Sequence, residues 1–356
     1  MPWGVWKWRP VGQAAIRDLH SDDARSRVRA LEEVAAWRHP DDGILENVVA
    51  LLDDRIREVR LAAAGAAARL RIEKARTKLV DMLDREDSEI VGVAAHALAA
   101  IGGPQVRGIL EGLLDREEGT VRCEAAVSLA ELMGSEAGPI LVRRFDDEDP
   151  YVRWGAIAAV GDVDYRDAIE QVAARLDDPH EEVRFEAAYT LARFGDSRGL
   201  EILGGYVTHK VRAYMCCEVL GRLGDPRAVP FLRKAWKSWR VHPIVRLRAA
   251  ASLAMLDVAD ARRDLLKKAL SGRMAHRQVA LDLLGDVGGG DAVGLLEQAV
   301  REGRFASVAV ESLTRLHDDR ARACLKRLQG AAGLDAEARN LVRRALDEIA
   351  SSAPQD

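Results

Sequence analysis

The side chains that could perform chemistry in this sequence are few, and their spacing favours no reaction. His96 and Cys123 fall on neighbouring predicted helices, and His209 lies shortly before Cys216 and Cys217. Neither set has the Cys-x₂-Cys or paired-histidine spacing of a zinc site. No phosphate-binding loop, dinucleotide-binding glycine motif, nucleophile elbow or His-Glu-x-x-His motif occurs. We therefore expect no catalytic residue, no metal and no cofactor.

Composition narrows the class of protein. The 356 residues are 48% hydrophobic and 31% charged, with a formal net charge of −4, which is enough apolar material to bury a core. No run of 18 apolar residues occurs, so we expect no transmembrane helix and no membrane partner. The N-terminus lacks a signal-peptide layout, and four cysteines are too few for a disulfide framework. These features favour a cytoplasmic protein with reduced thiols.

A repeated sequence pattern determines where the candidate binding residues lie. The pattern Val-Arg-x-x-Ala begins at Val59, Val121, Val152, Val183 and Val245. Alignment on the valine gives six anchor positions 31 residues apart, which are Val28, Val59, Ile90, Val121, Val152 and Val183. The period then varies through Val211, Val245, His276, Phe305 and Ala338. This self-similarity predicts about eleven units across nearly the whole chain.

Each unit is predicted to contain two helices. In the clearest unit, residues 167–176 show apolar residues at helical spacing, and the Asp-rich turn 177–182 suits the start of a second helix. That helix runs from Val183 to about Phe194, and Gly195-Asp196 ends it. The predicted fold class is therefore an all-α solenoid. Glycines recur near the equivalent helix end at Gly134, Gly161, Gly224 and Gly288.

The unit from Asp177 to Asp196 resembles the HEAT-like repeats of the phycobilisome-lyase type, a bacterial-type repeat. The resemblance rests on the Asp-rich turn, Val-Arg-x-x-Ala-Ala, a leucine and the terminal Gly-Asp. It implies a right-handed α-solenoid, an α-α superhelix, whose second helices line the concave side. We expect a Trp-rich cap segment at 1–14, a single solenoid at 15–350 and a disordered tail at 351–356. Stacked repeats share one continuous core, so we expect a monomer.

Arginine follows the anchor in nine of the units. We expect each guanidinium to donate two hydrogen bonds to a carboxylate of an Asp-rich turn, which is a structural role. The other interpretation is a row of arginines that binds phosphate groups. The aspartates concerned are Asp53, Asp84, Asp115, Asp147 and Asp178, and the arginines are Arg29, Arg60, Arg122, Arg153, Arg184, Arg212, Arg246, Arg277 and Arg339.

Aromatic residues gather at the predicted groove positions of three consecutive units. Exposed aromatic side chains are frequent anchors of protein-binding surfaces. The predicted groove contains Tyr151, Trp154, Phe185, Glu186, Tyr189, Arg193 and Tyr214. In a competing interpretation the register is shifted by one residue and the rings pack between helices, with Phe185 and Tyr214 the residues most affected.

Charge is divided unevenly along the chain. Residues 1–196 carry a net charge of −12 and residues 197–356 carry +8. Cations interleaved with tryptophan suit either a nucleic acid or an acidic protein. The predicted basic patch contains Arg233, Lys234, Lys237, Trp239, Arg240 and Arg248.

The resulting functional prediction is a non-enzymatic scaffold that binds a protein or peptide in the aromatic groove. One alternative is a nucleic-acid binder or a HEAT-like alkylpurine DNA glycosylase, since Trp154, Tyr189 and Arg193 imitate part of such a site. However, Ala158 stands where that family has a catalytic aspartate. Another alternative is a chromophore or small-molecule lyase of the phycobilisome-lyase branch. The hydroxylase branch needs repeated His-Glu pairs, and this sequence has only His180-Glu181.

Overall fold

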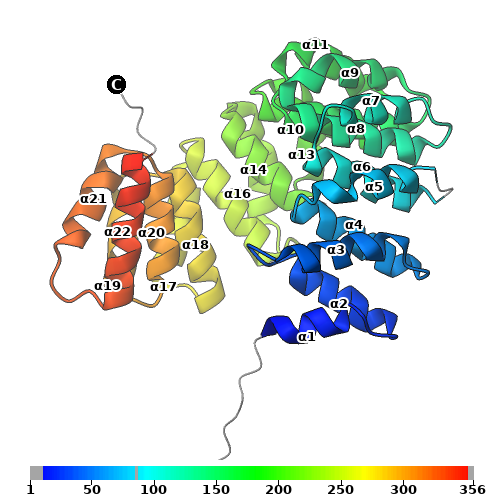
Figure 1. The fold of residues 1–356 in the computed structure, drawn as a ribbon. Helices are drawn as coiled ribbons and strands as arrows, with labels where there is room; N and C mark the ends of the chain where they lie inside the picture. Colours follow the sequence, from blue (N-terminus) through cyan, green and yellow to red (C-terminus); the bar gives the residue numbers. More distant parts are fainter. Residues whose placement is uncertain (1–10, 85–86, 352–356) are drawn as a thin grey trace, which may run out of the picture. The chain divides into compact units, whose positions relative to one another are not determined.

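The computed structural model describes residues 11–84 and 87–351 (Figure 1). These residues form helices and turns with no strand among them, so the predicted all-α class is confirmed. They divide into two compact units, residues 1–190 and 191–356, here called unit 1 and unit 2. Most of the expected cap, residues 1–10, and the expected tail beyond Ser351 lie outside the described residues. The continuity of one solenoid over 15–350, and its hand, stay predictions.

Unit 1 is built from helix pairs, each with a first helix, a turn and a second helix. The first helices are α1 (Val11–Asp18), α3 (Asp42–Ala50), α5 (Arg76–Met82), α7 (Val106–Leu113), α9 (Gly138–Arg143) and α11 (Ile169–Ala174). The second helices are α2 (Ala24–Val34), α4 (Arg57–Arg69), α6 (Ser88–Ile101), α8 (Gly119–Met133), α10 (Pro150–Asp162) and α12 (Glu181–Arg193), which crosses the unit boundary. Short 3₁₀ helices flank the first helices: η1 (Leu51–Asp53), η2 (Glu73–Ala75), η3 (Gly134–Ala137), η4 (Arg144–Asp146), η5 (Arg166–Ala168) and η6 (Arg175–Asp177).

Unit 2 repeats the same plan. Its first helices are α13 (Leu200–Tyr206), α15 (Val229–Lys237), α17 (Ala259–Ser271), α19 (Gly290–Glu302) and α21 (Asp319–Gln329). Its second helices are α14 (Ala213–Leu223), α16 (Pro243–Met255), α18 (Met274–Val287), α20 (Ala306–Arg315) and α22 (Ala336–Ser351). Its 3₁₀ helices are η7 (Ser197–Gly199) and η8 (Pro226–Ala228). Across the described residues the α-helices make eleven pairs, as the repeat predicts.

Within each unit the second helices pack on one another in chain order. The contacts join α2 to α4, α4 to α6, α6 to α8 and α8 to α10, and likewise α14 to α16, α16 to α18, α18 to α20 and α20 to α22. Small residues make this close approach possible. A Cβ atom on Gly155 of α10 would lie 2.3 Å from the Sγ atom of Cys123 on α8. Each repeat therefore completes the apolar core of the repeat beside it.

The predicted anchors form the centre of the core in unit 1. Val59, Ile90, Val121, Val152 and Val183 are all at most 3% exposed, which confirms the 31-residue alignment over these repeats.

Two other predicted anchors were wrong. Val28 is only half-buried, because the aligned arginine of the first repeat is Arg27 and not Arg29, which is exposed. Val211 is 80% exposed and precedes α14. The turn before α14 differs in length from the other turns, so the residue equivalent to the anchors of the other repeats is Arg212.

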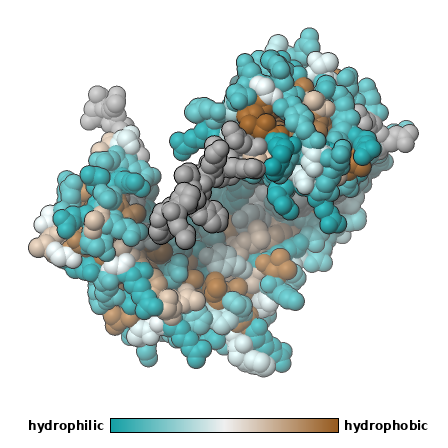
Figure 2. Space-filling model, turned by 60° about the horizontal axis from the view of Figure 1, so that its bottom comes forward, coloured by the Kyte–Doolittle hydropathy of each residue, from teal (hydrophilic) through white to brown (hydrophobic). Residues whose placement is uncertain are grey.

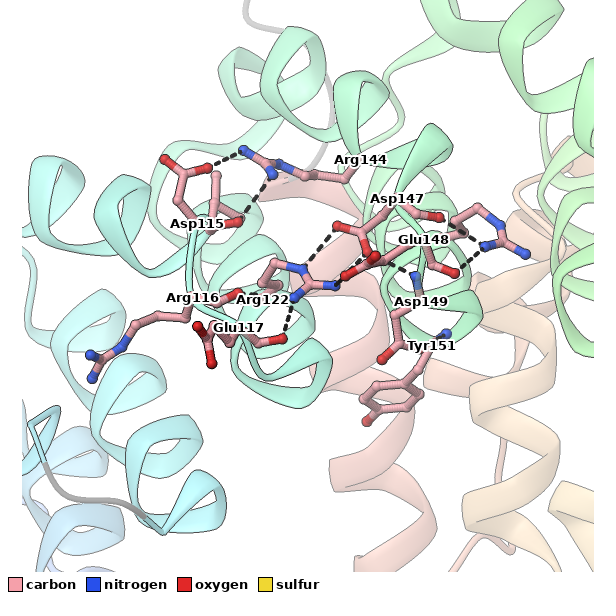
Figure 3. Close-up of polar contacts among 11 residues, drawn as sticks. Asp115, Arg116, Glu117, Arg122, Arg144, Asp147, Glu148, Asp149 and Tyr151 are labelled. Carbon is pink, nitrogen blue, oxygen red and sulfur yellow. Dashed lines mark hydrogen bonds and ion pairs between the residues drawn. The ribbon is translucent and has the colours of Figure 1, made fainter.

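Arginines of the repeat join neighbouring repeats through buried ion pairs (Figure 3). Arg122 donates to both carboxylate oxygens of Asp147 in the next repeat, at 3.0 and 2.7 Å, and to the carbonyl oxygens of Arg116 and Glu117 in its own turn. Arg153 makes the same contacts, with Asp178 at 2.9 Å. The predicted pairing with the Asp-rich turn is therefore confirmed for Arg122 with Asp147 and for Arg153 with Asp178. It was wrong for Asp53 and Asp115, which pair with Lys78 and Arg144.

Residues with positive φ end several second helices. Gly134, Gly224 and Gly288 have φ of +58°, +73° and +66°, where a glycine is favoured. Gly161 was wrongly expected in this role. It lies inside α10, and Asp164, with φ +50°, takes the left-handed conformation after that helix.

One stretch, residues 119–146, is long and apolar enough by composition to cross a membrane. In the structure it comprises α8 and α9, separated by a turn at Gly134, and half of its most apolar window is buried. A spanning helix needs about 20 continuous residues. The stretch is therefore weak evidence for a membrane span, since core helices of repeat arrays have the same composition.

Candidate functional site

The second helices α6, α8, α10 and α12 of unit 1 present a surface here called the second-helix face. Two of its aromatic side chains form a stacked pair. The rings of Tyr151 and Trp154 lie 5.5 Å apart at 18°, and Tyr151 is 41% exposed. The indole N–H of Trp154 donates to the Glu186 carboxylate on α12 at 3.0 Å. The pair is therefore held in one orientation by the neighbouring repeat.

The Asp-rich turn before α10 sets the position of this pair. Asp149 accepts from the backbone N–H of Tyr151 at 2.8 Å, and Pro150 occupies the first turn of the helix. Asp147 accepts from the backbone N–H of Asp149 at 3.0 Å while its carboxylate holds Arg122 (Figure 3). Tyr151 thus begins α10 at a point fixed by capping and by a buried ion pair.

A shallow pocket of about 390 Å³ opens beside Tyr151. Gly92 leaves room in its wall, since a Cβ atom there would meet the side chain of Glu124 at 2.9 Å. Carboxylates therefore stand next to an aromatic ring and small apolar groups. The pocket is lined by Ser88, Glu89, Gly92, Val93, His96, Thr120, Glu124 and Tyr151.

A contact between a histidine and a carboxylate borders the same face. His96 Nδ1 lies 2.8 Å from the Glu131 carboxylate on α8, with both side chains largely exposed. The sequence did not predict this contact. A histidine and a glutamate 35 residues apart carry no local signal of pairing.

The thiols near these helices are not activated. Burial raises the pKa of Cys123 to about 12, with the nearby Glu124 carboxylate adding to the effect. Burial also raises the pKa of Cys216 and of Cys217 to about 12. A nucleophilic cysteine needs a lowered pKa. Among the described residues no group of three His, Cys, Asp or Glu side chains could hold a metal ion.

Phe185 does not belong to the accessible surface, so its assignment to the groove was wrong. It is 4% exposed, and its ring stacks on Tyr189 at 6.3 Å. Phe185 follows its anchor by two residues, as Cys123 does, and both are buried. Side chains at this position enter the space between adjacent second helices, and Trp154 is half-buried there because its indole reaches Glu186.

The other predicted groove residues divide between the units. Glu186 and Tyr189 lie half-buried on α12 within unit 1, whereas Arg193 and Tyr214 belong to unit 2. The hydroxyl of Tyr214 accepts a hydrogen bond from Arg248 at 2.9 Å. That contact ties Tyr214 to α16 in unit 2.

The predicted basic patch is partly accessible. Lys234, Lys237, Trp239 and Arg240 are exposed, and the Arg240 guanidinium lies 5.3 Å from the Trp239 ring centroid.

Two of its members have carboxylate partners. Arg233 is half-buried against Asp260 at 2.9 Å. Arg248 was wrongly placed in the patch. It is 6% exposed and pairs with Asp286 at 2.7 Å, because its position on α16 faces neighbouring second helices.

Comparison with known proteins agrees with this architecture. Residues 139–215 match the family model of HEAT repeats, and residues 216–235 match that of the PBS lyase HEAT-like repeat. No curated protein matches the sequence significantly.

Solved structures resemble the chain at low sequence identity. The Escherichia coli protein YibA is 18% identical, with 75% of this chain and 98% of that chain covered and a TM-score of 0.51. An engineered protein is 20% identical over 96% of this chain and 99% of its own, with a TM-score of 0.37. An importin β structure is 12% identical over 94% of this chain and 52% of its own, with a TM-score of 0.45.

At these identities the likeness to YibA supports the fold alone. HEAT repeats support a repeat scaffold for protein interaction. The helix pairs are those of an all-α solenoid, within which residues 139–215 match HEAT repeats and residues 216–235 match the PBS lyase HEAT-like repeat.

Proposed function

We propose that this protein is a non-enzymatic interaction scaffold and that the second-helix face of unit 1 binds a protein or peptide. The observation that carries the proposal is the Tyr151–Trp154 stack, exposed on one side and fixed by Glu186 on the other. Aromatic side chains held in one orientation give large contact area with little loss of conformational entropy. In this proposal the residues around them bind and orient the partner.

The pocket beside Tyr151 indicates the kind of partner. Its polar lining includes Glu124 and also Glu89, which pairs with Arg57, and Glu131 on α8 contacts the lining residue His96. Carboxylates around an aromatic anchor complement a segment that carries an apolar side chain and a basic one. We therefore expect a partner segment with a positive charge next to its buried anchor.

The two enzyme alternatives have less support. A glycosylase would need an acid on the face one turn after Trp154, and Ala158 occupies that position. Burial of Phe185 also removes one of the aromatic residues available to a base or to a linear tetrapyrrole. No motif on the second-helix face favours a lyase over a simple binder.

We also propose a reducing, cytoplasmic location and a monomeric state. All four cysteines are free and buried, as the sequence analysis expects for thiols that form no disulfide framework. Size-exclusion chromatography with light scattering measures the oligomeric state directly.

The proposal is tested by affinity capture from native lysate, followed by binding measurements with the captured protein. Trp154→Ala should weaken binding by about 2 kcal/mol, roughly 30-fold, as loss of an interface anchor does. Tyr151→Ala should act in the same direction without removing the Glu186 hydrogen bond. Trp239→Ala is the matched control, since it removes an exposed tryptophan from unit 2.

Circular dichroism checks that the variants keep their helical content. Equal affinity of wild type and both unit 1 variants, with folding intact, would contradict the proposed face. Capture that nuclease abolishes would replace a protein partner by nucleic acid.

A further inference from the structure

The exposed hydrophobic side chains of unit 2 are confined to one kind of turn. Hydrophilic residues cover most of the surface seen in Figure 2. In the described part of unit 2 the exposed large hydrophobic residues are Val211, Trp239, Leu270 and Met274, at 80%, 82%, 50% and 56% exposure. All four lie in or beside the turns that join the first and second helices of three consecutive repeats. We call residues 207–212, 238–242 and 270–274 the turn edge.

Packing places these turns along one edge of unit 2. The second helices that follow them, α14, α16 and α18, pack on one another in order, as do the first helices α13 and α15. Pro243 at the second turn and His276 just after the third line one pocket of about 170 Å³. Met274 in turn contacts Arg304 from the next repeat. The turns therefore follow one another in order along this edge.

The sequence of the turn edge and its flanks contains cations and no acid, while two carboxylates from other segments stand nearby, namely Asp264 in the pocket and Glu302, which binds Arg277 at 2.6 Å. No Asp or Glu occurs in residues 207–212, 237–243 or 267–277. The exposed cations that surround the apolar tips are Lys210, Lys237, Arg240, Lys267, Lys268 and Arg273.

Histidines accept backbone hydrogen bonds in two of these turns, and His242 replaces a capping aspartate at the start of α16, whereas His209 precedes Arg212, the N-cap of α14. His209 Nδ1 accepts from the backbone N–H groups of Val211 and Arg212, at 3.4 and 3.3 Å, and His242 Nδ1 accepts from Ile244 at 3.3 Å. In unit 1 the corresponding caps include Asp87 and Asp149. At α16 the cap is thus kept while the negative charge is removed.

We infer that the turn edge of unit 2 docks the protein on an anionic lipid bilayer. Apolar tips from several turns can enter a fluid interface at the same time, and tryptophan favours the headgroup level. The cations beside them match the negative surface potential of anionic lipids. This is peripheral contact and not membrane spanning. It differs from the expectation of no membrane partner.

The shape and chemistry of the edge favour this occupant over two others. Single-stranded nucleic acid binds to successive aromatic platforms, and this edge offers one aromatic tip, Trp239, with Val211, Leu270 and Met274 beside it. An acidic peptide is held between walls, whereas these side chains protrude from turns. The inference uses unit 2 alone and does not rest on the proposed protein-binding face.

The test is cosedimentation of the full chain with vesicles of phosphatidylcholine alone or mixed with phosphatidylserine. Wild type should bind the mixed vesicles, bind the neutral ones weakly, and lose affinity as salt is raised. Each cation near an anionic surface strengthens binding by about fivefold. Lys237→Glu/Arg240→Glu should therefore weaken binding at least about 25-fold, and Trp239→Ser about tenfold through lost apolar contact.

Matched controls remove similar groups elsewhere. Arg322→Glu/Lys326→Glu reverses two exposed charges on α21, and Val127→Ser removes an exposed apolar group of unit 1. Both should bind vesicles as wild type does. Equal binding by the turn-edge variants would overturn the inference. Failure of wild type to bind mixed vesicles would also overturn it, in favour of nucleic acid or an acidic protein if a labelled oligonucleotide or a poly-glutamate peptide binds instead.

Discussion

The turns inside the repeats of unit 1 and unit 2 occupy the same place in the fold and differ in chemistry. Before α10 the turn offers Asp147 and Asp149, which bind Arg122 and cap the helix. Before α16 the turn offers Trp239, which protrudes, and His242, which caps the helix through Nδ1. In these two turns a side chain supplies a hydrogen-bond acceptor to the start of the second helix, from a carboxylate in one and an imidazole in the other. The charge of the turn is therefore free to differ between the units.

The arginine after the anchor shows the same contrast. In unit 1 Arg153 joins two repeats, with Asp178 on one side and the carbonyl oxygens of Asp147 and Glu148 on the other. In unit 2 Arg246 donates to the carbonyl oxygen of Trp236 at 3.0 Å, within its own repeat. The acidic turn before α10 thus contributes to cohesion between repeats, whereas the turn before α16 does not. The contrast concerns these two turns, because Arg277 of unit 2 also binds a carboxylate of the next repeat, Glu302, at 2.6 Å.

The largest expected effect comes from breaking a buried ion pair of unit 1. Arg153→Ala leaves Asp178, which is 6% exposed, without its partner, and should lower the free energy of unfolding by about 3 kcal/mol. Arg246→Ala should cost about 1 kcal/mol, since one hydrogen bond to a carbonyl is lost. Denaturant unfolding followed by circular dichroism measures both. The surface control Arg107→Ala should change little, and equal costs for Arg153 and Arg246 would erase the contrast between the two turns.

Acid should weaken the same pairs. Burial tends to raise the pKa of Asp178, but hydrogen bonds from Arg153 and from the His180 N–H outweigh it and leave that pKa below its ordinary value of 3.8. A carboxyl group whose pKa is lower in the folded state stabilises the folded state fully at pH values above its ordinary pKa. This stabilisation disappears as the pH falls through the folded-state pKa.

The free energy of unfolding should therefore fall in acid, and it should fall less in Arg153→Ala/Asp178→Ala than in wild type. Unfolding titrations at neutral pH and at successively lower pH values measure this difference. The same pH dependence in both proteins would show that the pair contributes nothing to acid sensitivity.

Much of the fold follows from spacing, because five 31-residue steps place Val59, Ile90, Val121, Val152 and Val183 at equivalent core positions. The alignment fails at Val211 because the turn there lacks the Asp-rich pattern that marks the start of the second helix.

The candidate site is less predictable, because the exposure of each side chain depends on which residues of the neighbouring repeat it contacts. Trp154 and Phe185 share one repeat position, yet only Trp154 finds a carboxylate across the helix interface. Arg248 is buried by its pairing with Asp286, a contact between repeats that local periodicity does not encode.

The smallest expected effect comes from giving unit 2 the turn chemistry of unit 1. His242→Asp keeps an acceptor for the Ile244 N–H and adds negative charge at the helix N-terminus, so it should stabilise the protein by about 0.5 kcal/mol. The same carboxylate stands beside Trp239 and Arg240, so binding to anionic vesicles should weaken by several fold. Thermal unfolding and cosedimentation measure the two effects on one protein. Higher stability with weaker vesicle binding would show that the capping role of residue 242 is independent of its effect on the surface charge. Lower stability together with weaker binding would mean that the His242 side chain is needed to form the turn.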